Sequence, residues 1–345
     1  MPTIHDVARE SGVSITTVSM VLNKGSRPVS AEARRRVLEA ARALNYTPNA
    51  NARALVSRRI RSVGVVFGTN QTGLNLVNPY ISAVLQGVLD AATEREHNIG
   101  LYTRPWRDAE RDAAAFRDGR ADGVLIFAPV LGSDLVPGIA ALGMPLVVVS
   151  GPSGEPEVPY VDVDNAHGVR LAVEHLLGLG HRRIAHLMGN LDQANVLERR
   201  DAFCAALGEA GVSVPPEYLV AGQYNEVSGR ENTRRLLDLP EPPTAIFAGN
   251  DVLAIAALDA ARERGLRVPE DLSVVGFDDI PAASLVTPAL TTVFQPLTEI
   301  GAQATRLLID VLDGRPADPG GVLLEPKLVV RGTTAPPPPS VLSSP

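Results

Sequence analysis

The chain has 345 residues, of which 45% are hydrophobic and 21% charged, which is ordinary for a soluble globular protein of two or three domains. Its net charge of −7 would by itself argue against a nucleic-acid partner. The charge is unevenly distributed, however: residues 1–61 carry 11 basic and four acidic side chains, a net charge of +7, and the remaining residues carry −14. A basic segment on an acidic body is typical of a modular nucleic-acid-binding protein.

Export and membrane insertion are not expected. The single cysteine, Cys204, cannot form an intrachain disulfide, which fits a reducing compartment. The first residues, MPTIHDVARESG, contain acids and lack the apolar run of a signal peptide. No stretch approaches the roughly 18 consecutive apolar residues that a membrane span requires. We therefore expect a cytoplasmic protein with no membrane partner.

Residues 1–46 are predicted to form a small domain of three helices. Thr3, Ser14 and Ser30 can each cap one of them. The first helix spans about 4–11 and the second continues to about residue 22. In the third helix, the apolar residues Ala33, Val37, Ala41 and Leu44 recur at helical spacing.

The first two helices carry the spacing of a helix-turn-helix. Ala8 allows close helix contact, and Gly12 permits the sharp turn between the helices. On the second helix Val18, Val21 and Leu22 should face inward. The opposite face then presents apolar and hydroxyl side chains that can contact thymine methyls, base edges or phosphates, namely Ile15, Thr16, Ser19 and Met20. The alternative is a small helical bundle with two exposed apolar residues, which leaves the basic charge unexplained.

Residues 47–60 are predicted to be a hinge. Pro48 can begin a helix, but fewer than ten helical residues are too short to be stable alone, since about 12–15 are already marginal. Leu55 lacks an evident partner in so short a helix. It could wedge between base steps in the minor groove, or pack on its dimer mate or on the core; spacing alone does not decide.

After residue 61, short buried strands alternate with amphipathic helices, which predicts parallel sheets in a doubly wound α/β fold. The number of strands indicates two such sheets, with a ligand in the crevice at the strand C-termini. The predicted strands are 62–67, 99–103, 123–127, 146–149, 160–163, 184–188, 245–248 and 273–277. The predicted helices are 80–96, 109–119, 165–179, 196–210, 228–237, 251–264 and 297–313. The tail 335–345, APPPPSVLSSP, is predicted to be disordered.

Ordered motifs across the chain resemble the lactose/galactose repressor family of bacterial transcription regulators. They include TIHDVARESGVSITTVSMVLN, VSAEARRRVLEAARALNYTPNANARAL, VDVDNAHG, LGHRRIAHLMG, TAIFAGNDVLAIAAL, RVPEDLSVVGFDD, TPALTTVFQPLTEIG and LVVRGTTAPP, in family order from residue 3 to about 335. The resemblance implies an all-α helix-turn-helix head, a hinge and a periplasmic-binding-protein-like core at 61–334. The core would divide into an N-subdomain (61–161 with 291–321) and a C-subdomain (162–290 with 322–334), joined by three crossing strands.

The resemblance also implies partners: a pseudo-palindromic double-stranded operator, a homodimer or dimer of dimers, and a small-molecule effector, expected to be a sugar or sugar derivative. It favours the minor-groove wedge for Leu55. The expected DNA contacts are Thr3, Ser14, Ile15, Thr16, Thr17, Ser19, Met20, Asn23, Tyr46, Asn51, Arg53, Ala54 and Leu55. The expected effector contacts are Tyr80, Gln193, Asn195, Arg199, Tyr224, Asn250, Asp251 and Asp278.

These effector residues suit a polyol because Asp and Asn pair with neighbouring hydroxyls, an Arg fork bridges two oxygens and an aromatic ring covers an apolar face. A purine-like or sugar-phosphate effector stays open. Asp164 and Asp278 could instead cap helices or turns. Three features depart from the family: Ile15 and Met20 on the recognition helix, the long loop before Asn78-Pro79-Tyr80, and Ser150-Gly151 after the fourth strand.

Two other classes of protein are less well supported. An enzyme would need a catalytic or cofactor motif, but the six histidines form no His-Glu-x-x-His, and no zinc cluster, phosphate loop or nucleophile elbow is present. We therefore expect no cofactor, no metal and no catalytic residue. A periplasmic binding protein would share the core fold but would need a signal peptide and would have no use for a basic head.

Overall fold

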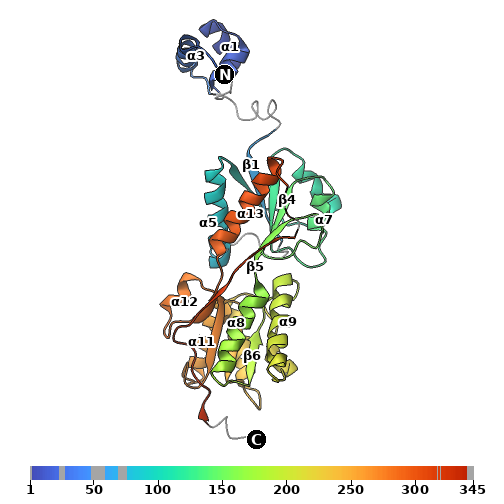
Figure 1. Cartoon of the computed structure of the whole chain (residues 1–345), viewed down its shortest axis with the longest axis vertical. Coiled ribbons are helices and arrows are strands. Elements are labelled where there is room, and N and C mark those ends of the chain that lie inside the picture. The colour runs from blue at the N-terminus through green and yellow to red at the C-terminus, as the bar shows by residue number, and fades with distance from the viewer. Residues whose placement is uncertain are drawn as a thin grey trace. The chain divides into compact units, whose positions relative to one another are not determined.

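The computed structural model describes residues 2–22, 28–47, 59–68, 76–316, 318 and 320–339. The chain divides into two compact units, with the boundary between Ile60 and Arg61. The smaller unit holds the head, and the larger one holds the two-lobed core (Figure 1). In the described residues no helix is long and apolar enough to cross a membrane.

The head contains three helices, as predicted: α1 (Ile4–Ser11), α2 (Ile15–Leu22) and α3 (Ala31–Ala43). They enclose a small core in which Val7, Val18 and Val37 are completely buried. Gly12 ends α1 in the left-handed region, at a φ of 64°, which a residue with a Cβ adopts only at a cost. The predicted turn of the helix-turn-helix is therefore confirmed at Gly12.

The first lobe of the core is a six-stranded parallel sheet in the order β11-β5-β4-β3-β1-β2. Its strands are β1 (Ser62–Phe67), β2 (Asn98–Tyr102), β3 (Gly123–Phe127), β4 (Leu146–Val149), β5 (Tyr160–Val163) and β11 (Val322–Leu324). Its helices are α5 (Pro79–Glu94), α6 (Ala109–Asp112), the 3₁₀ turn η1 (Ala113–Phe116), α7 (Leu135–Ala140) and α13 (Leu297–Leu312).

The second lobe repeats this plan in the order β12-β10-β9-β8-β6-β7, parallel except for the antiparallel β10–β12 pair. Its strands are β6 (Ile184–Leu187), β7 (Leu219–Val220), β8 (Ala245–Ala248), β9 (Ser273–Asp278), β10 (Thr291–Phe294) and β12 (Lys327–Val329). Its helices are α8 (Asn165–Gly178), α9 (Ala194–Glu209), η2 (Pro216–Tyr218), α10 (Glu226–Leu237), α11 (Asp251–Glu263) and α12 (Pro281–Leu285). The prediction of two doubly wound sheets is confirmed.

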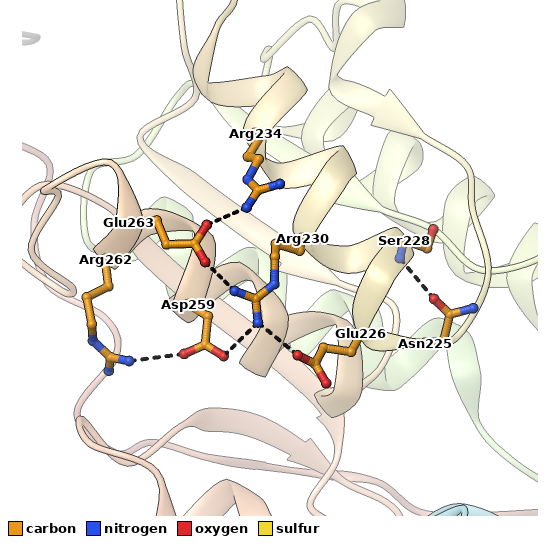
Figure 2. Close-up of polar contacts among 8 residues, drawn as sticks. All are labelled: Asn225, Glu226, Ser228, Arg230, Arg234, Asp259, Arg262 and Glu263. Atoms are coloured by element: carbon orange, nitrogen blue, oxygen red, sulfur yellow. Dashed lines mark hydrogen bonds and ion pairs between the residues drawn. The ribbon is translucent and has the colours of Figure 1, made fainter.

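Glycines allow two helix pairs to pack closely. In the first lobe, α5 and α13 lie side by side (Figure 1), and a Cβ on Gly87 would come within 1.8 Å of the Thr298 carbonyl oxygen. In the second lobe, a Cβ on Gly229 of α10 would lie 2.7 Å from the Ala256 Cβ of α11. The same approach brings Arg230 of α10 into ion pairs with Asp259 and Glu263 of α11 (Figure 2).

The three crossings between the lobes lie beyond the predicted subdomain boundaries. Strand pairing keeps all of β5 and β11 in the first sheet and all of β10 in the second, so the chain crosses after Val163, Phe294 and Leu324. The predicted boundaries at 161, 290 and 321 are therefore too early. The boundary at 161 divides β5, and those at 290 and 321 assign β10 and β11 to the wrong lobe, because periodicity cannot show which neighbour a strand pairs with.

Three further predictions need correction. The helix predicted at 109–119 is a single turn of α-helix followed by a 3₁₀ turn ending at Phe116. The sequence reading missed α7, α12, β7, β10, β11 and β12, which are short or open to solvent on one side. The tail is not disordered from residue 335, because the Ala335 carbonyl accepts hydrogen bonds from Ser273 Oγ and the His181 ring, and Pro337 is buried.

Candidate functional site

Helix α2 presents one face to solvent and packs the other on the head. Val18 and Val21 are buried, and Leu22 packs against the same core, as predicted. Ile15 is 40% exposed and Thr16 is exposed beside it. Ser19 and Met20 are half-buried, so the outward face is centred on the first turn of α2. Contact with a thymine methyl would remove the apolar side chain of Ile15 from water. This turn is therefore the part of α2 best suited to a major groove.

Three predicted DNA-contact residues hold the ends of the helices. Thr3 and Asp6 form a reciprocal capping box at the start of α1. Ser14 Oγ accepts a hydrogen bond from the Thr17 N–H at 3.2 Å, and the two hydroxyls are 2.9 Å apart. These side chains are exposed or half-buried at helix N-termini, where phosphate binding is favoured, so capping and DNA contact are compatible.

Of the remaining predicted head contacts, Tyr46 is the one that the structure describes. Tyr46 is half-buried and packs against the head core, so its ring has a structural role. Arg34, Arg35 and Arg36 are all exposed, and Arg35 is held in ion pairs with Glu32 and Glu39. Asn23, Asn51, Arg53, Ala54 and Leu55 lie outside the described residues, as does most of the predicted hinge.

The cleft between the lobes is organised around Arg199 of α9, which is only 3% exposed. Its Nε donates to Asn165 Oδ1 at 2.8 Å, and its Nη1 donates to the Gly249 carbonyl at 2.6 Å. The guanidinium carbon lies 3.7 Å from the centroid of the Phe277 ring, a cation–π arrangement. Of the adjacent pair predicted from the sequence, Arg199 points inward, whereas Arg200 pairs with Asp201.

Two buried carboxylates flank Arg199, one from each lobe. Asp162 lies one residue before the end of β5 and Asp278 ends β9, and each is 4% exposed. Burial raises the pKa of Asp162 to about 7, against the opposing effects of a backbone hydrogen bond and of Arg199. Burial likewise raises the pKa of Asp278 to about 7, with Arg199 and Gln295 opposing the shift. Arg199 donates to neutral oxygens rather than to either carboxylate, so both acids keep acceptor capacity.

Tyrosines from both lobes border the same cleft. The Tyr80 hydroxyl at the start of α5 donates to Ser150 Oγ, and Ser150 adopts a φ of 63°, unusual for a residue with a side chain. Burial, together with the nearby Asp162, raises the pKa of the Tyr80 hydroxyl. Tyr224 packs its ring over Gly189, where a Cβ would come within 2.3 Å of the ring. Burial raises the pKa of Tyr224 as well.

Two of the predicted effector residues carry buried polar atoms with no protein partner. Among the described residues, neither Asn195 Oδ1 nor the Tyr224 hydroxyl has a hydrogen-bond partner. Buried polar atoms are nearly always satisfied, so such atoms beside Arg199 indicate a place for a polar ligand. The backbone of Gln193 forms an antiparallel bridge with Val130 across the cleft. Beside it, the Leu131 N–H donates to the Asp192 carbonyl at 2.7 Å.

Two predicted effector residues also have structural roles in the second lobe. Asn250 caps α11, its Oδ1 accepting from the Leu253 N–H at 2.9 Å. Asp251 is fully buried and accepts hydrogen bonds from the Ile280 N–H and the Thr292 hydroxyl. Asp164, for which capping was the alternative, does cap α8. Asp278 does not cap a helix: its Oδ1 accepts a hydrogen bond from Gln295 Nε2 at 2.6 Å.

Sequence reasoning missed Asp162, Asn165 and Gln295 as cleft residues. Asn165 Nδ2 donates to Asp162 and to Glu198, each at 3.1 Å, while its oxygen accepts from Arg199. A usable signal was present: Asp162 is an acid inside the otherwise apolar strand YVDV, where a buried charge demands a reason.

Comparisons with known proteins agree with this geometry. Residues 3–49 match the bacterial regulatory proteins of the lacI family, and residues 173–334 match a periplasmic binding protein-like domain. The HTH-type transcriptional regulator CelR of Thermobifida fusca is 37% identical over 333 residues, which cover 96% of this chain and 97% of that protein.

Two solved structures resemble the whole chain. A transcriptional regulator CelR–cellobiose complex has a TM-score of 0.74 at 35% identity, covering 96% of this chain and 100% of that one. A lac repressor dimer bound to operator and the anti-inducer ONPF has a TM-score of 0.84 at 30% identity, covering 97% and 99%. A helix-turn-helix unit followed by a two-lobed, periplasmic-binding-protein-like core defines a DNA-binding transcription regulator with a ligand-binding domain. The chain belongs to the lacI family of bacterial regulatory proteins.

Proposed function

We propose that this regulator is a cytoplasmic repressor that binds a pseudo-palindromic operator as a homodimer, and that a sugar or sugar derivative in the cleft controls its affinity for DNA. The observation that carries the sensing role is the pair of buried polar atoms without protein partners, on Asn195 and Tyr224, next to the buried Arg199. The cellobiose in the CelR complex and the operator in the lac repressor complex support the two ligand classes.

The geometry supports a binding role for the cleft rather than catalysis. Asp162 and Asp278 can accept hydrogen bonds from sugar hydroxyls, and Tyr80 and Tyr224 offer aromatic faces. Among the described residues, no group of three or more His, Cys, Asp or Glu side chains is placed to hold a metal ion. We infer a regulator without turnover: a bound sugar should be recovered unchanged after prolonged incubation with the protein.

The proposed control mechanism is movement of the lobes. In the described residues, the connections between the two lobes include three chain crossings and a bridge at Val130–Gln193. An effector that prefers one separation of the lobes shifts the spacing of the two heads in a dimer. A coupling of about 1–3 kcal/mol corresponds to a change in operator affinity of about 5–150-fold. Whether the effector releases or recruits the repressor follows from which separation it prefers.

The function is tested by selecting duplex DNA from a random library with the full-length protein and then screening sugars and nucleosides by thermal shift. A ligand that binds only the folded state raises the melting temperature. We expect a two-fold symmetric consensus and at least one stabilising sugar. Failure to retain any duplex at low ionic strength would contradict the regulatory role.

The hinge is tested separately, because Leu55 lies outside the described residues. If Leu55 wedges between base steps, Leu55→Ala should weaken binding to the selected operator far more than binding to random duplex at the same salt concentration. Leu38→Ala, an exposed leucine on α3, is the control and should leave the ratio unchanged. Equal loss on both DNAs for Leu55→Ala would remove the wedge role.

A further inference from the structure

Loops around the cleft are nearly devoid of basic side chains. The segments that follow β3, β4, β6, β7, β8, β9 and β10 contain no Lys, Arg or His. The segment after the edge strand β2 is the exception, and its Arg104 and Arg107 are exposed. Ligands of parallel α/β sheets bind outside the carboxyl ends of the strands, which is where these segments begin. The loops therefore bring acids and neutral groups to the ligand, but almost no cation.

The basic side chain that does reach the cleft is already engaged. Phosphate and carboxylate groups are bound best by two parallel N–H groups of an arginine fork. Arg199 uses Nε for Asn165 and Nη1 for the Gly249 carbonyl, and its plane packs on Phe277. An anion could use the Nε edge of this fork only by displacing contacts made inside the second lobe, which leaves it the Nη hydrogens that these contacts do not use.

Several helix N-termini, the other common anion sites, are also occupied. The first turns of α5, α8, α10 and α11 are capped by side chains of the chain itself, namely Asn78, Asp164, Asn225 and Asn250. Helices α9 and α13 have no side-chain cap, but Asp192 lies just before the first turn of α9 and Glu299 lies in the first turn of α13. A capped terminus offers fewer free N–H groups, and an acid beside an open one opposes an anion.

The acids around the cleft outnumber the basic side chains there. Asp162 and Asp278 are buried on either side of Arg199, and Glu198 accepts from Asn165. A cavity of about 370 Å³ adjoins Asp278, and the charged residues in its lining are all acids: Asp278, Asp279 and Glu299. Asp279 is paired with Arg331 at 2.7 Å and Glu299 with Arg306 at 3.4 Å, whereas Asp278 accepts a hydrogen bond from the neutral Gln295 and forms no ion pair of this kind among the described residues. The balance of charge at the cleft is negative.

We propose that the cleft accepts uncharged polyhydroxy ligands and rejects their phosphorylated or carboxylated counterparts, with Asp162 and Asp278 as the residues that reject anions. Carboxylates that are not ion-paired accept hydrogen bonds from hydroxyls and repel a second anion. This inference rests on the proposed function, because it concerns the ligand of the same cleft. It separates sugars and nucleosides from sugar phosphates, sugar acids and nucleotides, which the sequence leaves open.

Matched ligand pairs test the inference by isothermal titration of the full-length protein. Each pair joins a neutral compound to its anionic form: hexoses and their 6-phosphates, hexoses and their uronic acids, disaccharides and their 6-phosphates, nucleosides and their 5′-monophosphates. In the pair that the protein recognises, we expect the neutral compound to bind at least tenfold more tightly than its anionic partner. An anionic member that binds as tightly as its neutral partner overturns the inference and leaves the regulatory role intact.

Two substitutions identify the residues responsible. Asp162→Asn and Asp278→Asn keep the shape of the side chain and remove its charge. Each should narrow the gap in affinity between the neutral and the anionic member of the binding pair by at least threefold. The control Asp238→Asn removes an exposed acid that pairs with Arg264 on the surface, and should leave the gap unchanged. An unchanged gap in both cleft variants, with unaltered folding by circular dichroism, overturns the assignment to these acids.

If no member of any ligand pair binds, both this inference and the proposed sensing role are overturned. Operator binding, measured on the same preparation, then decides separately whether the regulatory role stands.

Discussion

Two arginines in the second lobe are each surrounded by acids, but in different environments. Arg230 on α10 forms ion pairs with Glu226, Asp259 and Glu263 on the surface (Figure 2), where 26% of its side chain is exposed. Arg199 lies near Asp162 and Asp278 and is 3% exposed. The surface carboxylates pair directly with their arginine, whereas the buried ones do not. The carboxylates around Arg230 are therefore occupied by ion pairs within the protein. The carboxylates around Arg199 can still accept hydrogen bonds from a ligand.

The difference shows what burial does to similar groups. A side-chain hydrogen bond from Arg234, aided by one from Arg230, lowers the pKa of Glu263 against the opposing effect of burial. Burial raises the pKa of Asp162 and of Asp278 to about 7, against the attraction of Arg199. Exposed pairs contribute little to stability, while unpaired buried charges are costly and persist where they serve a function.

The largest effect is expected from Arg199→Met, which breaks the buried cluster. Removing one partner of a buried charge cluster typically costs about 3–5 kcal/mol, because the remaining acids lose their compensating charge. The effector-dependent change in operator affinity should disappear, while operator binding without effector persists. Thermal unfolding and anisotropy titrations on the same preparation measure both. A normal effector response in this variant would contradict the assignment of the cleft.

A smaller effect is expected from Gly229→Ala, which tests the packing beneath the surface cluster. The new Cβ would lie 2.7 Å from the Ala256 Cβ and 3.2 Å from the Leu253 Cα, so α10 must move away from α11. Overpacking of this kind costs about 1–3 kcal/mol. Gly208→Ala in α9 is the matched control: its Cβ meets nothing within 4 Å, so it should stabilise the core by up to about 1 kcal/mol. Equal melting temperatures for the two variants would rule out the close helix contact.

The pH dependence of stability separates the two clusters by sign. Asp162 and Asp278 have folded-state pKa values of about 7, above the unfolded value near 4, so the folded protein binds more protons between these limits. Their contribution to the free energy of unfolding therefore falls as the pH rises through 7, by about 1 kcal/mol for each acid between pH 6 and pH 8. Glu263 contributes in the opposite direction, and its contribution is lost as the pH falls through its lowered pKa.

Melting curves of wild type, Asp162→Asn and Asp278→Asn at pH 6 and pH 8 check this sign. The difference between the two pH values should shrink in each variant relative to wild type. Differences that stay equal in all three proteins would contradict the raised pKa values.

The smallest effect is expected from Arg230→Met, although this substitution breaks more ion pairs than any other in Figure 2. Exposed pairs are screened by water and salt, so the melting temperature should stay close to that of wild type and the effector response should be unchanged. A fall in melting temperature as large as that caused by Arg199→Met would contradict the distinction between the surface cluster and the buried one.

The head was predictable because its determinants are local. Val18, Val21 and Gly12 act within a few residues of each other, so periodicity and turn chemistry suffice to place them. The alternation of strands and helices was predictable for the same reason. Short strands such as β10 and β11 were not, because their pairing depends on which sheet the chain reaches after each crossing.

The cleft was predictable only in part, and through resemblance rather than pattern. Arg199, Tyr224 and Asp278 lie there as expected, since family motifs fix their positions in the chain. Asn250 has the residue type of a ligand contact, but its side chain is used to cap α11. Asp162 was missed because part of its significance comes from Arg199, which is distant in the sequence and approaches it only after the lobes fold.

The coupling of the two units is the central claim, and fluorescence anisotropy of the selected operator tests it most directly. Full-length protein is titrated into labelled operator at fixed salt, with and without the sugar that raises its melting temperature. The account predicts that the sugar changes operator affinity about 5–150-fold in wild type and not at all in Arg199→Met. Superimposable wild-type curves with saturating sugar would contradict it.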